Sequence, residues 1–127
     1  MNKVKQRVLI IDDNKLQCDF LSEITRLGGL EPLTSMSPNK AIATFAAESP
    51  DFIVLDLCIP EMDGIEIMSR LAGLGCAARI ILMSGHGRDL LHSAGRFGKR
   101  IELNIIGLLM KPFDGNDLLR LLQVKAI

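Results

Sequence analysis

Short, wholly apolar runs alternate with longer amphipathic segments along the chain. We predict that the apolar runs are strands buried on both faces, because a strand covered on both sides of a sheet needs no polar face. These runs cover residues 8–11, 52–55, 80–83 and 106–110, and a weaker strand is expected over 30–34. Pro32 lies in the weaker strand and cannot donate a ladder hydrogen bond, which favours an edge position for it.

The segments between these strands show the spacing and the end signals of helices. Between residues 14 and 27 apolar side chains recur at helical spacing, and two glycines follow as a stop signal. These apolar positions are Leu16, Phe20, Ile24 and Leu27. A helix over residues 88–97 is expected to carry Leu90, Ala94 and Phe97 together. The start signals of three further helices are Ser37-Pro38, Asp63-Gly64 and Asp114.

Five strand–helix units in succession predict an α/β fold. The expected architecture is a five-stranded parallel sheet with helices on both faces. With the second strand at an edge, the flavodoxin-like strand order 2-1-3-4-5 is favoured. We find no repeat, low-complexity stretch or linker, so residues 1–127 are predicted to form a single domain.

Composition leaves the fold unchanged but excludes several functions. Lys plus Arg and Asp plus Glu number 15 each, and this balance argues against a dedicated nucleic-acid binder. Apolar residues make up 48%, yet no apolar run is long enough to span a bilayer, and no signal-peptide pattern is present. Three cysteines without C-x-x-C spacing indicate neither a disulfide framework nor a zinc site. We therefore expect a cytoplasmic domain that contacts neither nucleic acid nor a membrane directly.

Polar residues stand where the predicted strands end. They are Asp12-Asp13 after the first strand, Asp56 after the third, Ser84-Gly85 after the fourth and Lys111-Pro112-Phe113 after the fifth. In an open α/β sheet the ligand site lies outside the carboxyl ends of the strands. Three carboxylates, a hydroxyl and an ammonium group are therefore expected to converge on one crevice.

The carboxylates of this crevice predict a metal site. Carboxylates so close together repel one another unless a cation joins them. Their oxygen atoms suit Mg²⁺, which commonly completes its coordination with phosphate oxygens. Each residue alone has an ordinary explanation, such as a solvated loop, a helix cap or a turn. Their joint occurrence at one edge of one sheet favours a phosphoryl site.

This set of residues resembles the receiver domain of two-component response regulators, over essentially the whole chain. The matching segments are Ile10-Ile11-Asp12-Asp13, Val54-Leu55-Asp56-Leu57 with Ile59-Pro60-Glu61-Met62-Asp63-Gly64, Met83-Ser84-Gly85 and Lys111-Pro112-Phe113. The resemblance implies that a histidine kinase or a phosphotransfer protein phosphorylates Asp56 and that the domain then switches an output surface. It implies an acceptor that phosphorylates and dephosphorylates itself rather than an enzyme.

The resemblance also implies a role for each site residue. The Mg²⁺ ligands would be Asp12, Asp13, Asp56 and the backbone carbonyl of Cys58, and the groups on the phosphoryl oxygens would be Ser84 and Lys111. The thiol of Cys58 receives no role. The Lys111–Pro112 peptide bond is expected to be cis. The chain would be a stand-alone receiver or the N-terminal module of a longer regulator.

Two features depart from the receiver pattern. Leu108, three positions before Lys111, stands where receivers usually carry Tyr or Phe, so we expect the response to phosphorylation mainly in residues 85–105. The stretch between Ser84 and Lys111 is also longer than in a typical receiver. With Gly98, Leu103, Gly107 and Leu109 it resembles receivers that precede EAL-type cyclic-di-GMP phosphodiesterase domains, which implies an output domain of that class. A lengthened loop of no special ancestry is the alternative.

The same residues also bear on three other functions. A phosphatase of the haloacid dehalogenase type needs a second acid two residues after the nucleophile, where Cys58 stands. A flavodoxin or dinucleotide binder needs a Gly- or hydroxyl-rich phosphate loop after the first strand, where Asp12-Asp13 stand. A pseudo-receiver, a protein-interaction module independent of phosphorylation, is the remaining alternative. The complete set of site residues disfavours it.

Overall fold

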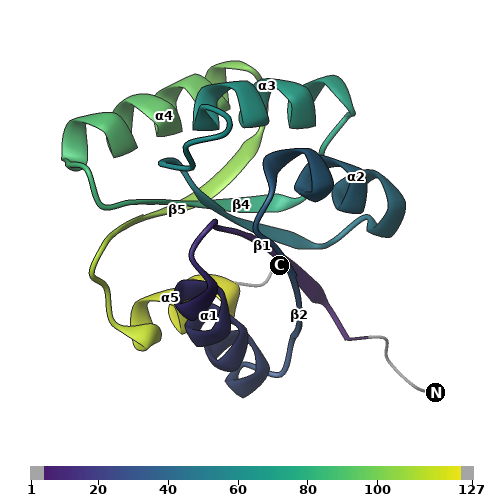
Figure 1. Ribbon diagram of the computed structural model, residues 1–127, viewed down its shortest axis with the longest axis vertical. Helices are drawn as coiled ribbons and strands as arrows, with labels where there is room; N and C mark the ends of the chain where they lie inside the picture. Colours follow the sequence, from purple (N-terminus) through teal and green to yellow (C-terminus); the bar gives the residue numbers. More distant parts are fainter. Residues whose placement is uncertain (1–4, 124–127) are drawn as a thin grey trace.

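Residues 5–123 are described by the computed structural model, and they form a sheet with helices on both faces (Figure 1). The strands are β1 (Arg7–Ile11), β2 (Glu31–Ser35), β3 (Phe52–Asp56), β4 (Arg79–Ser84) and β5 (Asn104–Met110). The helices are α1 (Lys15–Leu27), α2 (Pro38–Glu48), α3 (Gly64–Gly73), α4 (Arg88–Arg100) and α5 (Gly115–Leu122). Helices α1 and α5 cover one face of the sheet, and α2, α3 and α4 cover the other (Figure 1).

The strand order is β2-β1-β3-β4-β5, and every strand pairing is parallel. Both the sheet and its order confirm the predicted fold class. Pro32 lies in the edge strand β2, as its missing N–H requires. The strand order reverses between β1 and β3, and in such sheets a crevice opens at this point outside the carboxyl ends of the strands.

Two hydrophobic cores, one on each face, hold the helices to the sheet. Successive residues of a strand point to opposite faces. In β1, Leu9 and Ile11 belong to the core shared with α2, α3 and α4. Val8 and Ile10 belong to the core shared with α1 and α5. Strands β1, β3 and β4 are almost wholly buried, which is what their continuous apolar runs indicate. The same expectation is wrong for β5, an edge strand in which only Leu109 is buried.

Polar side chains fix the starts of three helices. The side chains of Asn14 and Asp63 accept backbone hydrogen bonds in the first turns of α1 and α3. Asp114 forms a capping box with Asp117 at the start of α5, where the sequence predicts a cap. Ser37 occupies the N-cap position of α2, but its side chain makes no cap hydrogen bond, so the prediction holds for its position and not for its hydroxyl.

The face of α1 that packs against the core is not the face that its apolar spacing predicts. Leu16 and Leu27, two residues of the apolar stripe that predicts the helix, are 80% and 75% exposed. Phe20 is also exposed, and Ile24 is half-buried. The buried residues of α1 are Cys18, Leu21, Ser22 and Thr25.

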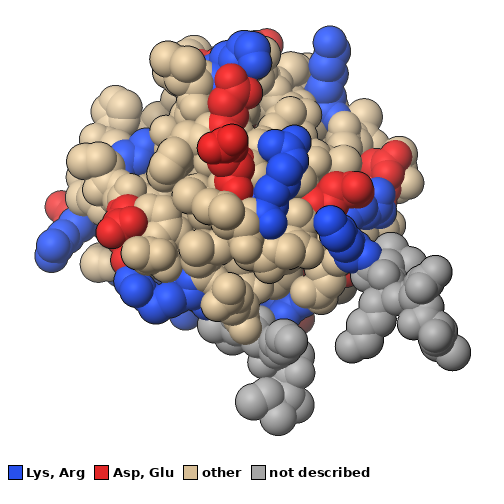
Figure 2. Space-filling view, turned by 90° about the horizontal axis from the view of Figure 1, so that it is seen from below, with Lys and Arg blue, Asp and Glu red and all other residues tan. Residues whose placement is uncertain are grey.

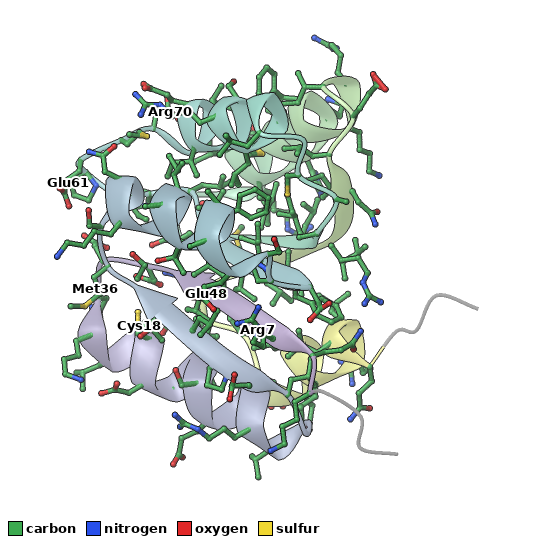
Figure 3. All side chains as sticks on the ribbon, turned by 90° about the vertical axis from the view of Figure 1, so that its right-hand side faces the viewer. Arg7, Cys18, Met36, Glu48, Glu61 and Arg70 are labelled. Carbon is green, nitrogen blue, oxygen red and sulfur yellow. The ribbon has the colours of Figure 1, made fainter. Side chains whose placement is uncertain are left out.

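Small polar side chains can be buried on α1 because backbone carbonyls satisfy their hydrogen bonds. The Thr25 hydroxyl donates to the Leu21 carbonyl at 2.7 Å. The Cys18 thiol donates to the Asp12 carbonyl at 3.2 Å, and it lies between α1 and the sheet (Figure 3). Burial raises the pKa of Cys18 to about 11, so the thiol stays protonated and can donate.

The long stretch between Ser84 and Lys111 is ordered secondary structure and not a lengthened loop. Helix α4 continues past residue 97 to Arg100, and β5 begins at Asn104 instead of residue 106. The buried face of α4 also differs from the predicted one, because Leu90 is 39% exposed and Phe97 is half-buried. The buried residues of α4 are Leu91, Ala94, Gly95 and Gly98.

Charges of both signs are mixed over the face that α1 and α5 form. Figure 2 shows this face from below, with acidic and basic side chains interspersed and no continuous basic field. A surface that follows a phosphate backbone would gather basic side chains instead. Among residues 5–123 no helix is both long and apolar enough to cross a membrane.

Candidate functional site

The polar residues predicted for one crevice do meet at the carboxyl edge of the sheet. Asp56 and Ser84 are the last residues of β3 and β4. Asp12 directly follows β1, and Lys111 directly follows β5. The strands run in parallel, so these four ends lie on the same side, and the Lys111 amide donates to the Ser84 carbonyl at 2.8 Å. The Lys111–Pro112 peptide is cis, as expected.

Three carboxylates form the centre of the site. One oxygen each from Asp12, Asp13 and Asp56 lies within 4.8 Å of the other two. Asp12 is fully buried and Asp56 is 4% exposed, whereas Asp13 is exposed to solvent. Oxygen donors this close, with one side open to water, fit a hard divalent cation that keeps part of its hydration shell.

Lys111 joins the two buried carboxylates. Its Nζ lies 3.2 Å from Oδ2 of Asp12 and 3.2 Å from Oδ2 of Asp56. The remaining oxygens accept backbone hydrogen bonds, Asp12 Oδ1 from the Asn14 amide at 3.0 Å and Asp56 Oδ1 from the Cys58 amide at 3.1 Å. Each buried carboxylate is therefore held at both oxygens and has a fixed orientation.

The electrostatic balance differs between the carboxyl and the ammonium groups. Burial raises the pKa of Asp12, and the neighbouring Asp56 raises it further, while the Asn14 amide and Lys111 oppose this shift. Burial lowers the pKa of Lys111, but Asp56 and Asp12 outweigh burial and hold it above its usual range. Lys111 therefore stays protonated at neutral pH and can face further negative charge.

The Ser84 hydroxyl lies at the same edge and is fully buried. Its oxygen accepts a hydrogen bond from the His86 amide at 3.1 Å, and the Cys58 sulfur lies 3.8 Å from it. Within the described part of the chain, no hydrogen bond joins this hydroxyl to Asp56 or Lys111. The contact with the Cys58 thiol could not be predicted, because the sequence shows only that each residue stands at the end of a neighbouring strand.

A hollow opens directly beside Lys111. It has a volume of about 430 Å³ and lies between α1 and the segment that follows β5. Its lining residues are Gln17, Phe20, Gly85, Lys111, Pro112 and Phe113. The site is thus reachable from solvent on the side of the exposed part of α1.

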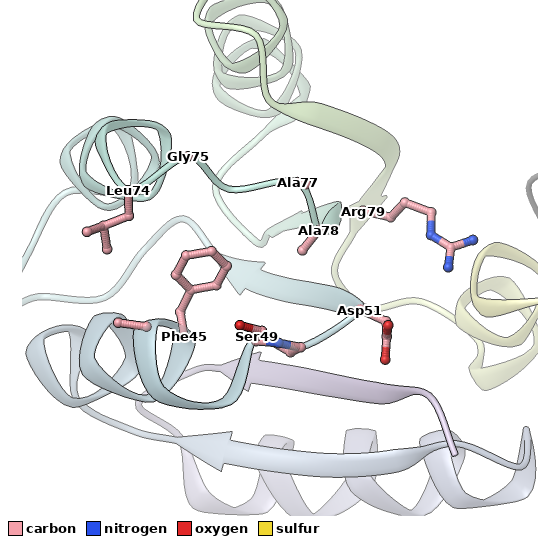
Figure 4. A pocket seen from close by; sticks show the side chains of 10 residues that line it. Phe45, Ser49, Asp51, Leu74, Gly75, Ala77, Ala78 and Arg79 are labelled. Atoms are coloured by element: carbon pink, nitrogen blue, oxygen red, sulfur yellow. The ribbon is translucent and has the colours of Figure 1, made fainter. Parts of the chain in front are cut away.

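Another groove lies at the opposite, amino-terminal edge of the sheet. It has a volume of about 620 Å³ and separates the end of α2 from the segment between α3 and β4 (Figure 4). Phe45 and Leu74 line its apolar part, and Asp51 and Arg79 lie where β3 and β4 begin. No residue of the carboxylate cluster belongs to it, so it is separate from the site described above.

The sequence profile of the Response regulator receiver domain matches residues 8–123. The chain belongs to this family. It is therefore a receiver domain of the two-component response regulators, as the resemblance of its motifs implies. The same match leaves the similarity to receivers that precede EAL-type domains without support.

Individual relatives agree with this assignment. Sporulation initiation phosphotransferase F of Bacillus subtilis is 28% identical over 91% of this chain and 89% of its own length. A response regulator structure from Colwellia psychrerythraea is 34% identical over 94% of both chains, with a TM-score of 0.81. A response regulator structure from Burkholderia pseudomallei, 22% identical over 94% of this receiver and 68% of that chain, has a TM-score of 0.79 and shares the fold. That structure contains a phosphorylated aspartic acid and a calcium ion.

Proposed function

We propose that this receiver accepts a phosphoryl group on Asp56, with Mg²⁺, from a histidine kinase or a phosphotransfer protein. One observation carries the proposal. Asp56 is a buried carboxylate that lies both within the three-carboxylate cluster and 3.2 Å from the Lys111 ammonium group. This position gives an acceptor oxygen a place for a cation on one side and a fixed positive charge on the other.

Phosphoryl transfer to a carboxylate needs positioning and charge neutralisation more than covalent help. A bond forms between an Asp56 oxygen and phosphorus while the bond between phosphorus and the donor breaks. The Cys58 amide holds one Asp56 oxygen, which orients the carboxylate for attack. Lys111 lies close enough to pair with the new phosphoryl oxygens, and its raised pKa keeps it charged.

The donor set fits Mg²⁺. Asp12, Asp13, Asp56 and the backbone carbonyl of Cys58 would hold the ion, which would neutralise charge on the phosphoryl group when bound. The Burkholderia pseudomallei structure, which shares the fold, contains both a phosphorylated aspartic acid and a calcium ion.

The proposed activity is phosphorylation and dephosphorylation of the domain itself, not turnover of a separate substrate. Its proposed setting is the cytoplasm, where a kinase or phosphotransfer protein would reach it. A separate output domain, including one of EAL type, stays a prediction from the sequence alone. The pseudo-receiver alternative makes a different prediction, because it acts without any phosphoryl transfer.

The test is chemical labelling with acetyl phosphate and Mg²⁺, followed by intact-mass measurement. The wild-type chain should gain one phosphoryl mass, and Asp56→Asn should gain none. Asp19→Asn, which changes an exposed carboxylate of α1, is the matched control and should label like the wild type. Labelling retained in Asp56→Asn would place the acceptor elsewhere, and an unlabelled wild type would favour the pseudo-receiver.

A further inference from the structure

The thiol of Cys58 contacts the Ser84 hydroxyl of the site. From this contact we infer that Cys58 is a positioning residue, whose thiol holds the Ser84 hydroxyl in the unphosphorylated domain and so lowers the affinity of the domain for a phosphoryl group. The inference rests on the proposed function, because it assigns a role in phosphorylation at Asp56. It also gives a role to a side chain that sequence reasoning leaves without one.

Residue 58 connects the acceptor to the hydroxyl. Its amide donates to Asp56 Oδ1 at 3.1 Å, and its sulfur lies 3.8 Å from Ser84 Oγ. Asp56 and Ser84 are the last residues of the neighbouring strands β3 and β4, and Cys58 lies two residues after the end of β3. Cys58 is half-buried and Ser84 is fully buried, so water competes little for this contact.

The Ser84 hydroxyl has two hydrogen-bonding contacts in the unphosphorylated domain. The oxygen accepts from the His86 amide, and either the thiol or the hydroxyl can donate across the contact with Cys58. No other hydrogen bond of the Ser84 side chain exists among residues 5–123. The His86 amide gives this buried hydroxyl one partner, and the Cys58 thiol gives it a second.

A phosphoryl group on Asp56 would compete with the thiol for this hydroxyl. Where the Ser84 hydroxyl donates to the sulfur, it must turn away from the sulfur to donate to a phosphoryl oxygen instead. A thiol is a weak hydrogen-bond donor and acceptor, so the contact can be broken, but breaking it has a cost that the phosphoryl group must offset. The thiol therefore favours the unphosphorylated arrangement, and a ligand that binds Ser84 favours the other one.

Substitutions of Cys58 should change the affinity in opposite directions. Cys58→Ala removes the competing partner and should raise the affinity for beryllofluoride, a phosphoryl mimic, by about threefold. Cys58→Ser introduces a hydroxyl, a stronger partner than a thiol, and should lower this affinity by about threefold. Cys76→Ala removes a buried cysteine outside the site and is the matched control.

The measurement is a beryllofluoride titration of the 127-residue chain with saturating Mg²⁺, followed by amide resonances. The His86 amide is the specific reporter, because it donates to Ser84 Oγ. In Cys58→Ala the free-state His86 resonance should move toward its beryllofluoride-bound position. In the Ser84→Ala background, Cys58→Ala should no longer change the beryllofluoride affinity, because the group it acts through is absent.

The outcomes separate the inference from the proposed function. If the wild type does not bind beryllofluoride, the proposed function fails and the inference fails with it. If the wild type binds and Cys58→Ala and Cys58→Ser bind equally well, only the inference is overturned. An equal effect of Cys58→Ala with and without the Ser84 hydroxyl would also overturn it, because the thiol would then act by another route.

Discussion

Asp12 is fully buried beside Asp56, and ionising it opposes folding in the absence of a metal. Its pKa is raised above the usual 3.8, first by burial and then by Asp56. A raised carboxyl pKa means that the folded state holds the proton more tightly than the unfolded state. The stability gained in this way is present below pH 3.8 and is lost as the pH rises through the folded-state pKa.

Asp12→Asn should therefore stabilise the metal-free protein at pH 7. We expect a higher free energy of unfolding for this variant at pH 7, with a smaller difference at acidic pH. Urea denaturation in the presence of a chelator, at pH 5 and pH 7.5, measures both effects. Asp13→Asn removes an exposed carboxylate of the same cluster and should change the stability less. A loss of stability in Asp12→Asn at pH 7 would contradict this account.

At the scale of residues, the sequence predicts the main-chain position of the site better than its side-chain contacts. Asp12, Asp56 and Lys111 could be placed together because each follows a strand, and parallel strands end at one edge. The distance between the Cys58 sulfur and the Ser84 oxygen depends on side-chain rotamers across two strands. No spacing in the sequence encodes such a contact.

At the scale of elements, the strands and the helices differ in how well their burial can be predicted. A strand buried on both faces is a continuous apolar run, so no decision about which face packs against the core is needed. A helix buries only one of its faces, and the apolar spacing of α1 predicts the wrong one: Cys18 and Thr25 are buried while Leu16 is exposed. Small residues allow a helix to approach the sheet closely. They contribute little to the pattern of large apolar residues from which the buried face is predicted.

Helix α3 offers a matched test of close packing, because it begins and ends with glycine. A Cβ on Gly64 would lie 2.7 Å from a Leu57 methyl group and 3.1 Å from the Leu57 Cα. Gly64→Ala should lower the free energy of unfolding by about 1–3 kcal/mol, since backbone cannot easily give way. Gly73→Ala meets nothing within 4 Å and should leave the stability equal or up to about 1 kcal/mol higher.

Thermal and urea denaturation of the two glycine variants check this prediction. The difference between them isolates packing, because both replace glycine with alanine in the same helix. Equal stability of Gly64→Ala and Gly73→Ala would show that the Leu57 backbone moves freely. Leu57 directly follows Asp56, so such freedom would also contradict the fixed orientation of the acceptor.

At the scale of the whole molecule, the topology and not any single motif assembles the site. The acceptor and the hydroxyl end β3 and β4, the ammonium group follows β5, and these strands pair in that order. The sequence predicts this arrangement because the order follows from parallel strands and an edge proline. The same order connects the site to α4, since the segment after Ser84 leads directly into that helix.

The route from the site to α4 has two structural features. Gly87 has a φ of 106°, a backbone conformation that favours glycine, at the start of α4. Leu108 lies against Gly95 of α4, where a Cβ would be 3.1 Å from a Leu108 methyl group. Leu108 has no hydroxyl and no ring, so it cannot follow Ser84 as an aromatic side chain would. The segment after β4 remains as the direct connection.

We therefore expect phosphorylation to change residues 85–105 more than residues 106–110. Hydrogen exchange with and without beryllofluoride should differ most across residues 85–105, because Ser84 moves the backbone that follows it. Leu108→Ala should leave this difference largely intact, although it removes packing against Gly95 and lowers stability. A change centred on residues 106–110, or its loss in Leu108→Ala, would instead show that β5 transmits the signal through Leu108.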